Sequence, residues 1–247
     1  MTEKENELFY KTQITVFKTN KALIEAIDKL VPTDKRFAPH IHAGAEDKEW
    51  RQQVKSRIGI RMVDYSNGTG DKALWAEANL EPVKLKEIRQ TLMTHTGNYK
   101  YQFTQSKIWG HEVNKDGRSP VTILSIARSD KTADNNGNPI RNSWFVQIQN
   151  GTGVAAKNKT GGTYMKANSY QEETKCTIQM SDSDFFAFIE NCYTYLCVWE
   201  LSIGGALLKS YYNWKKTVQD TKELMENNTP PEADNDFDKD YPGSSAA

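Results

Sequence analysis

The chain reads Cys176-Thr177-Ile178-Gln179-Met180-Ser181-Asp182-Ser183-Asp184-Phe185 at the point where its hydrophobic period changes. Up to Met180, apolar and polar residues alternate as they do in a half-buried strand. From Phe185 onward, apolar residues recur at every third or fourth position, which is the period of a helix packed on one side. Ser181 and the carboxylate three residues later form a capping-box-like start, and both aspartates lie in the first turn, where the helix dipole favours negative charge. We therefore predict a strand that ends at Met180 and a helix that begins at Ser181.

Three more strand-like segments precede this strand. They span residues 99–113, 120–129 and 143–150, and the last strand spans 173–180. Asp116-Gly117 and Asn136-Gly137 supply the positive φ that tight antiparallel connections need. Because no helical pattern interrupts the four segments, they predict an antiparallel sheet rather than a parallel nucleotide-binding one.

The N-terminal half shows a weaker version of this order. Residues 7–18 predict a strand, 21–31 a helix, 57–65 and 73–80 two strands, and a second helix opens at Glu81-Pro82. At a separation of one hundred residues, four apolar positions of this half match four of the later one: Leu80, Leu85, Ile88 and Leu92 against Met180, Phe185, Phe188 and Cys192. An internal duplication and a chance coincidence both account for this match.

The predicted fold class is α+β, with antiparallel β-meanders of about four strands, each closed by a helix. A first unit covers residues 1–97 and a second covers 98–226, packed together as one globular body, and 227–247 form a disordered acidic tail. The alternative is an OB-fold barrel with added helices, which a helix between the third and fourth barrel strands would favour. The last helix either continues beyond Trp199 or breaks near Gly204-Gly205.

Charge is balanced overall but unevenly distributed. Lys+Arg and Asp+Glu both number 32, yet the last nineteen residues carry a net −4 and the segment between Asn98 and Cys176 a net +5. This asymmetry indicates either a polyanionic partner or an ordinary solvated surface. The N-terminus has no apolar signal region, and no stretch of the sequence is apolar over the length of a membrane span. Three cysteines in apolar surroundings are typical of reduced thiols. We therefore expect a cytoplasmic protein with no membrane association.

No constellation predicts catalysis, a cofactor or a metal. Residues 151–156 match the glycine pattern of a dinucleotide-binding turn, but residues 157–162 after them form a poor helix start. His40 and His42 have no third ligand nearby, and no serine lies in a nucleophile-elbow pattern. We therefore expect no enzyme.

Aromatic and basic side chains are interspersed along the second meander. A single-stranded nucleic acid needs π-faces for its bases, at about 1–3 kcal/mol per stack, and cations along its backbone. Alternation places about half of the rings in the core, and Trp109, Trp144 and Tyr164 are the predicted stacking set. The full predicted set of nucleic-acid contacts is Lys100, Lys107, Trp109, Arg128, Lys131, Arg141, Trp144, Lys157, Lys159, Tyr164 and Lys166.

Two resemblances bear on function. Four antiparallel strands followed by a helix, over residues 99–199 and more weakly before them, resemble the unit of the Whirly and PUR-like single-stranded nucleic-acid-binding proteins. The tail segment Asp234-Asn235-Asp236-Phe237-Asp238-Lys239-Asp240-Tyr241-Pro242 resembles the acidic tails of bacterial and phage single-stranded DNA-binding proteins. The bacterial tails end at a hydrophobic residue after proline, whereas Gly243-Ser244-Ser245-Ala246-Ala247 follow here. The resemblance implies partner binding by Asp234, Asp236, Phe237, Asp238, Asp240 and Tyr241.

Together these resemblances imply a sequence-tolerant single-stranded DNA-binding protein of replication or recombination, from a bacterial phage or mobile element. We expect it to act in the bacterial host cytoplasm, to form a homo-oligomer and to recruit replication or recombination proteins through its tail. Two alternatives stay open. One is an RNA-binding or transcription-regulating module on the same sheet, and the other is a protein-interaction or virion component.

Overall fold

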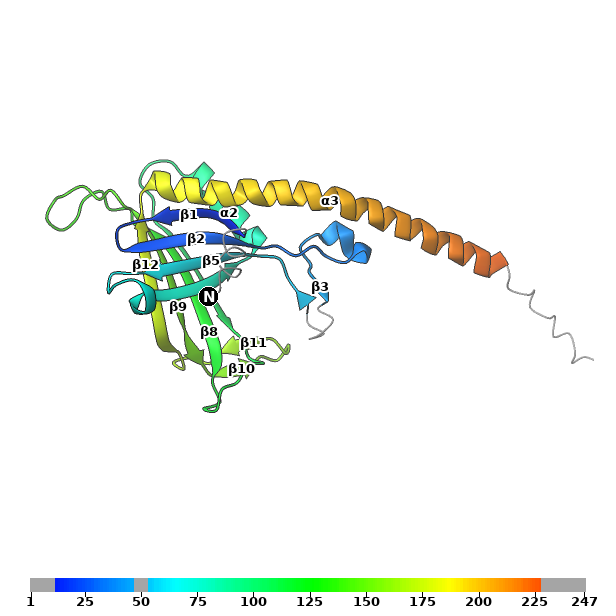
Figure 1. Cartoon of the computed structure of the whole chain (residues 1–247), viewed down its shortest axis with the longest axis horizontal. Coiled ribbons are helices and arrows are strands. Elements are labelled where there is room, and N and C mark those ends of the chain that lie inside the picture. Colours follow the sequence, from blue (N-terminus) through cyan, green and yellow to red (C-terminus); the bar gives the residue numbers. More distant parts are fainter. Residues whose placement is uncertain (1–11, 47–52, 228–247) are drawn as a thin grey trace, which may run out of the picture.

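The computed structural model describes residues 12–46 and 53–227 and shows an α+β protein (Figure 1). The first antiparallel sheet has the order β1-β2-β5-β6, with β1 (Gln13–Lys18), β2 (Ala22–Lys29), β5 (Arg57–Asp64) and β6 (Leu74–Leu80). The second has the order β12-β9-β8-β7, with β7 (Tyr101–Ile108), β8 (Ser119–Arg128), β9 (Trp144–Gly153) and β12 (Gln171–Met180). The predicted tail contacts Asp234, Asp236, Phe237, Asp238, Asp240 and Tyr241 lie outside the described residues.

Each sheet is followed by one α-helix, so the same order of elements occurs twice. These helices are α2 (Pro82–Thr94) and α3 (Asp182–Asn227). Shorter elements are η1 (Lys35–His40), η2 (Gly70–Lys72) and the two-stranded pairs β3 (Ala45–Glu46) with β4 (Gln53–Val54) and β10 (Ala155–Lys157) with β11 (Thr163–Met165). Both four-stranded sheets are open, and only the β10–β11 hairpin lies between β9 and β12 in the described chain. The OB-barrel alternative is therefore wrong.

One hydrophobic core joins both sheets and both helices. The apolar positions matched at a separation of one hundred residues are equivalent in space: Leu80 and Met180 end their strands, Leu85 and Phe185 lie in the first turns of the helices, and all four are buried. The core lies between the two sheets, whose strands cross in Figure 1, and α2 and α3 close one end of it.

The predicted helix over residues 21–31 is wrong, because this segment is β2. This strand pairs with β1 on one side and with β5 on the other. Ile24 and Ala26 face the core, while Glu25 and Ile27, which point the opposite way, are also buried. A strand that is buried on both faces loses the alternation of a half-buried one, and its apolar run then matches helical spacing equally well.

Hydrogen bonds from the second sheet cover the edge of the first at β6. The side-chain amide of Asn150 accepts a hydrogen bond from the backbone N–H of Glu77 (2.9 Å) and donates one to its carbonyl (3.0 Å). Gln105 Nε2 donates to the carbonyl of Asn79 at 2.9 Å. Side chains of β7 and β9 thus occupy edge groups that would otherwise recruit another strand.

The helix α3 begins as predicted, because Ser181 Oγ accepts a hydrogen bond from the backbone N–H of Asp184 at 3.1 Å. It continues through Gly204-Gly205 to Asn227 as one helix of 46 residues, about 69 Å at 1.5 Å per residue. Figure 1 shows its first half lying along the body and its orange second half extending away from it.

Candidate nucleic-acid interface

Two of the predicted nucleic-acid contacts, Arg128 and Trp144, lie in the core. They are opposite each other in the β8–β9 register, and both point inward. Trp144 is 1% exposed and stacks on Phe185 at a ring separation of 4.0 Å. Asp182 accepts hydrogen bonds from Arg128 Nε (2.8 Å), Arg128 Nη2 (3.0 Å) and Trp144 Nε1 (2.8 Å). The prediction that Trp144 stacks on bases and Arg128 contacts phosphate is corrected, because these side chains join β8 and β9 to the start of α3.

The other predicted residues fall into two groups at opposite ends of the second sheet. Lys100, Lys131 and Arg141 are exposed near the end where β7 begins and β8 stops. The remaining six lie at the other end, about 30 Å away along the ten residues of β8. They are Lys107 and Trp109 at the end of β7, Lys157, Lys159 and Tyr164 on the β10–β11 hairpin, and Lys166 just after it.

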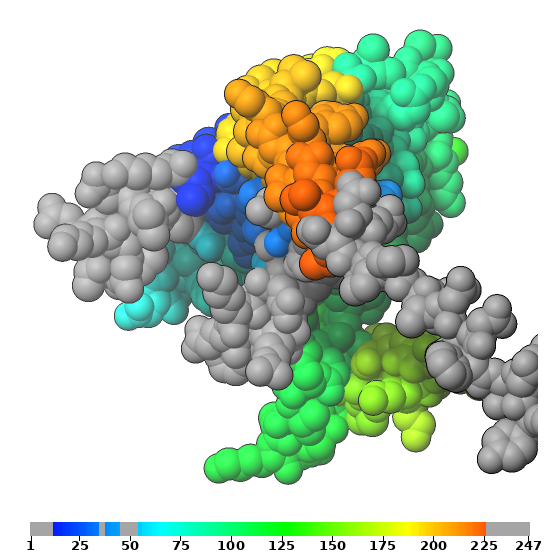
Figure 2. Space-filling model, turned by 90° about the vertical axis from the view of Figure 1, so that its right-hand side faces the viewer, coloured from blue at the N-terminus to red at the C-terminus, as the bar shows by residue number. Residues whose placement is uncertain are grey.

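The hairpin packs closely on the end of β7. A Cβ atom on Gly110 would lie 2.6 Å from Cγ2 of Thr163, so a larger residue at position 110 would displace that threonine side chain. In Figure 2 the green β7–β8 connection and the yellow-green hairpin lie side by side, away from α3. A hollow of about 260 Å³ lies at this contact, lined among others by Arg57, Lys107, Trp109 and Thr163. Trp109 is 39% exposed, so it keeps a free ring surface beside two cations.

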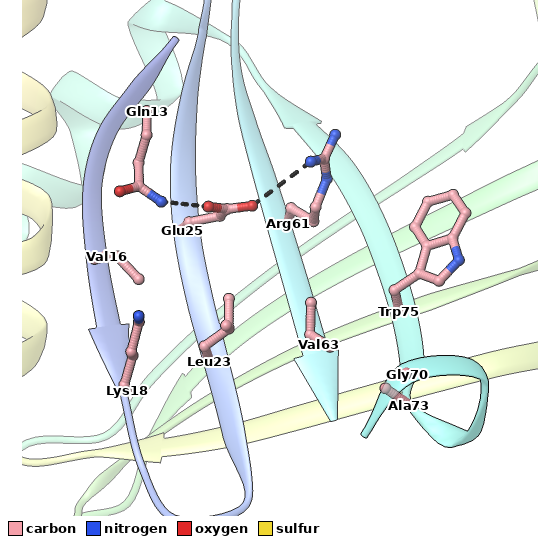
Figure 3. Close-up of a pocket in the computed structure, with 10 residues that line it drawn as sticks. All are labelled: Gln13, Val16, Lys18, Leu23, Glu25, Arg61, Val63, Gly70, Ala73 and Trp75. Carbon is pink, nitrogen blue, oxygen red and sulfur yellow. Dashed lines mark hydrogen bonds and ion pairs between the residues drawn. The ribbon is translucent and has the colours of Figure 1, made fainter. Parts of the chain in front are cut away.

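A larger hollow of about 470 Å³ lies on the first sheet (Figure 3). Strand register places Lys18, Leu23, Val63 and Trp75 in one row across β1, β2, β5 and β6, on the side of the sheet that faces away from the core. Leu23 and Val63 form an apolar floor, and the indole of Trp75 is 61% exposed at one edge. Lys18 is exposed at the opposite edge. The row offers an aromatic face and an apolar surface next to a cation.

Charged side chains form the next row of the same side. Glu25 is 3% exposed and accepts a hydrogen bond from Gln13, and its carboxylate lies 3.6 Å from Arg61 Nη1. Arg61 also donates from Nε (3.1 Å) and Nη2 (3.0 Å) to Glu77, which is paired in turn with Lys29. These contacts hold the guanidinium of Arg61 in a fixed position at the wall of the hollow.

The strand β5 connects the two hollows. Arg61 and Val63 line the larger one, and Arg57 lines the smaller one, about 20 Å from Val63 along the strand. Glu81, just after β6, pairs with Arg57 (3.4 Å) and with Lys107 of the second sheet (3.2 Å). One surface therefore runs from Trp75 to Trp109 and crosses from the first sheet to the second.

This surface has an excess of positive charge. Burial alone raises the pKa of Glu77, but hydrogen bonds and charges from Lys29 and Arg61 outweigh it and lower that pKa. Burial likewise opposes the effect of Lys107, Arg57 and Lys55 on Glu81, whose pKa is also lowered. The carboxylates of Glu77 and Glu81 therefore remain ionised at neutral pH. Six cations, Lys18, Lys29, Lys55, Arg57, Arg61 and Lys107, surround three carboxylates, Glu25, Glu77 and Glu81.

Sequence reasoning missed the half of this surface that lies on the first sheet. Arg57, Gly59, Arg61 and Val63 alternate with buried Ile58, Ile60 and Met62, and this period of two was the available signal for a shared face. The contribution of β2 to this surface was missed because residues 21–31 were predicted to be a helix, and Leu23 and Glu25 were therefore not assigned to the sheet. Trp75 is adjacent to buried Ala76 and shows the same alternation.

Comparisons with protein-family models, with curated proteins and with solved structures find no match to this chain. Within residues 12–46 and 53–227, no helix is both long enough and apolar enough to cross a membrane.

Proposed function

We propose that this protein binds single-stranded DNA with little sequence preference, on the surface between Trp75 and Trp109. The observation that carries this proposal is the pair of exposed indoles at the two ends of a cationic surface. Bases of any sequence stack on aromatic rings, and a backbone follows cations, so this arrangement suits a flexible single strand. A rigid duplex hides its bases and gains much less from the indoles.

We propose that each sheet and its helix form a Whirly/PUR-like ββββα unit, supported by the repeated order of four antiparallel strands and a helix. Fold likeness alone supports no ligand, so the argument for DNA rests on the surface.

Replacing Trp75 with alanine tests the proposal directly. Because the indole is largely exposed, the fold should be unaffected, while loss of one stacked base should raise the Kd for oligo-dT roughly 5- to 150-fold, equivalent to about 1–3 kcal/mol. Leu74→Ala is the matched control, since Leu74 is its 43% exposed neighbour on the other side of β6. Fluorescence anisotropy at low salt measures the Kd, and quenching of tryptophan emission reports stacking.

Three ligands of equal length distinguish the alternatives. Tighter binding of oligo-dT than of duplex DNA and oligo-U supports the proposal, whereas tighter binding of oligo-U identifies an RNA-binding protein, because the 2′-hydroxyl is then what the protein reads. If no oligonucleotide binds at low salt, or if Trp75→Ala binds like Leu74→Ala, this surface is not a single-strand site.

A role in replication or recombination, with partner recruitment by the acidic tail, remains part of the proposal. It is supported by the composition of residues 229–247, which carry a net −4 and follow a mildly basic body.

A further inference from the structure

The middle of α3 is unusually poor in charge for a helix at the surface. Between Asn191 and Trp214 the only charged residues are Glu200 and Lys209. Glu200 is already engaged, because it accepts hydrogen bonds from Lys86 (2.7 Å) and lies 2.9 Å from His42 Nε2. A helix with one buried and one solvated side carries charges on the solvated side, so this segment suggests that both of its sides are covered.

One side of this segment packs against the body. Leu196 is buried in the core, and Trp199 stacks on His42 with a ring separation of 5.3 Å. A Cβ atom on Gly204 would lie 3.6 Å from Ile41, so the helix also contacts the chain after η1. These contacts account for one apolar side only.

The other side is an exposed apolar stripe. Leu201 is 78% exposed, Tyr212 62%, Val198 58% and Leu208 40%, and a Cβ atom on Gly205 would have no neighbour within 4 Å. These five positions, 198, 201, 205, 208 and 212, are separated alternately by three and four residues, which is the spacing of a helix–helix seam. Thr194 one turn before the stripe and Lys215 and Lys216 just after it are polar, so the stripe has defined ends.

We propose that this stripe, named the α3 stripe, is the contact between two copies of the chain, with Gly205 at the closest approach of two α3 helices. The stripe is complementary to itself: Leu201 and Leu208 are projecting groups, and Gly205 between them leaves a hollow that accepts a leucine of the partner. A contact of a surface with itself is the isologous kind that closes a twofold dimer. None of its five residues carries charge, so two stripes meet without repulsion, whereas a nucleic acid has nothing there to pair with.

The apolar area of the α3 stripe determines how strongly two copies are expected to associate. The exposed parts of the four side chains amount to roughly 300 Å² per copy, well under the ~800 Å² that each partner contributes to a standard stable interface. The dimer is therefore a concentration-dependent one, and the measurements must span about 1 μM to 1 mM.

Leu201→Glu tests the α3 stripe by placing two like charges in an apolar contact. Sedimentation velocity of the full chain without DNA should show a monomer–dimer equilibrium whose Kd rises at least about tenfold in the variant. Val113→Glu is the matched control, because Val113 is a 60% exposed apolar residue in the β7–β8 connection, which lies away from α3 in Figure 2. Leu208→Glu serves as a second variant, and far-UV circular dichroism checks that the helix persists.

A cross-link gives an independent readout. In a Cys197→Ser background, which removes the partly exposed native thiol, Gly205→Cys should form a disulfide-linked dimer under a mild oxidant, and Val113→Cys should not. The proposal is overturned if the wild type sediments as a monomer throughout the concentration range. It is also overturned if Leu201→Glu and Leu208→Glu both dimerise as well as Val113→Glu. A monomer in which the thiol at position 205 resists a maleimide reagent would show that another segment of the same chain covers the stripe. Because no DNA is present, these results are independent of the DNA-binding proposal.

Discussion

Replacing Asp182 with asparagine should destabilise the protein by removing the carboxylate that neutralises Arg128. The Arg128 side chain is 4% exposed and that of Asp182 is 62% exposed, so the arginine is the buried partner. Besides Asp182, the guanidinium donates to the Tyr99 carbonyl at 2.7 Å and lies 4.5 Å from the centre of the Tyr99 ring. These contacts remain in Asp182→Asn, but none of them supplies a negative charge.

Two effects set the expected loss of stability in Asp182→Asn. Breaking a buried ion pair usually costs about 3–5 kcal/mol, because it leaves a buried charge uncompensated. The hydrogen bond from Arg128 is the largest cause that lowers the pKa of Asp182 from 3.8 to about 2, a shift equivalent to roughly 2.4 kcal/mol. Because this carboxylate is more than half exposed, solvent screening reduces that contribution to about 1 kcal/mol. With the asparagine amide still accepting one hydrogen bond, we expect a loss of about 2–3 kcal/mol.

Urea unfolding followed by circular dichroism measures this loss, and thermal unfolding should show a decrease in Tm of about 4–12 °C for a chain of this size. Asp116→Asn, in an exposed turn, is the control and should change the free energy of unfolding by less than about 0.5 kcal/mol. Arg128→Met combined with Asp182→Asn completes a double-mutant cycle, and the double variant should be more stable than the sum of the single losses predicts. Additive losses, or a loss under about 0.5 kcal/mol in Asp182→Asn, would refute the pairing argument.

The same contact predicts a pH dependence with a definite sign. The folded-state pKa of Asp182 lies below its unfolded value, so its contribution is complete above about pH 4 and disappears as the pH falls toward 2. The difference between the wild type and Asp182→Asn should therefore narrow over that range. A difference that stays constant from pH 5 to pH 2 would mean that this carboxylate is not the group that titrates.

Two further predictions concern DNA. Replacing Lys157, Lys159 and Lys166 with alanine should weaken binding of oligo-dT. The slope of log K against log salt concentration should become less steep by up to about 2, since each phosphate contact contributes a slope of about 0.7. An unchanged slope would mean that the hairpin is not part of the interface. Cutting the chain after Asn228 removes a net charge of −4 and should tighten DNA binding, most clearly below roughly 0.1 M salt, while Tm stays unchanged. Unchanged affinity at low salt would mean that the tail does not compete with DNA. A Tm lower by several degrees would mean that the tail is packed on the body.

Much of the fold followed from local signals in the sequence. The change of period at Ser181, the four strands of the second sheet and the two helices were predicted because alternation, turn glycines and a capping serine act within a few residues. The equivalence of Leu80 with Met180 and of Leu85 with Phe185 was visible for the same reason, since repeated local patterns retain their spacing.

Which side chains meet in space depends on the tertiary structure. Alternation shows that Trp144 and Phe145 point to opposite sides of β9, but only the packing of α3 on the sheet determines that Trp144 is the buried one. β2 became a strand because β1 and β5 pair with it on both sides, which no local pattern specifies. The surface between Trp75 and Trp109 joins residues of both units, and it exists because Glu81 at the end of β6 reaches Lys107 of β7. Local patterns therefore predicted most of the elements and their order, because those elements depend on near neighbours, but they did not predict β2. The interface depends on contacts between residues far apart in the chain, and these residues meet only when the two sheets pack together.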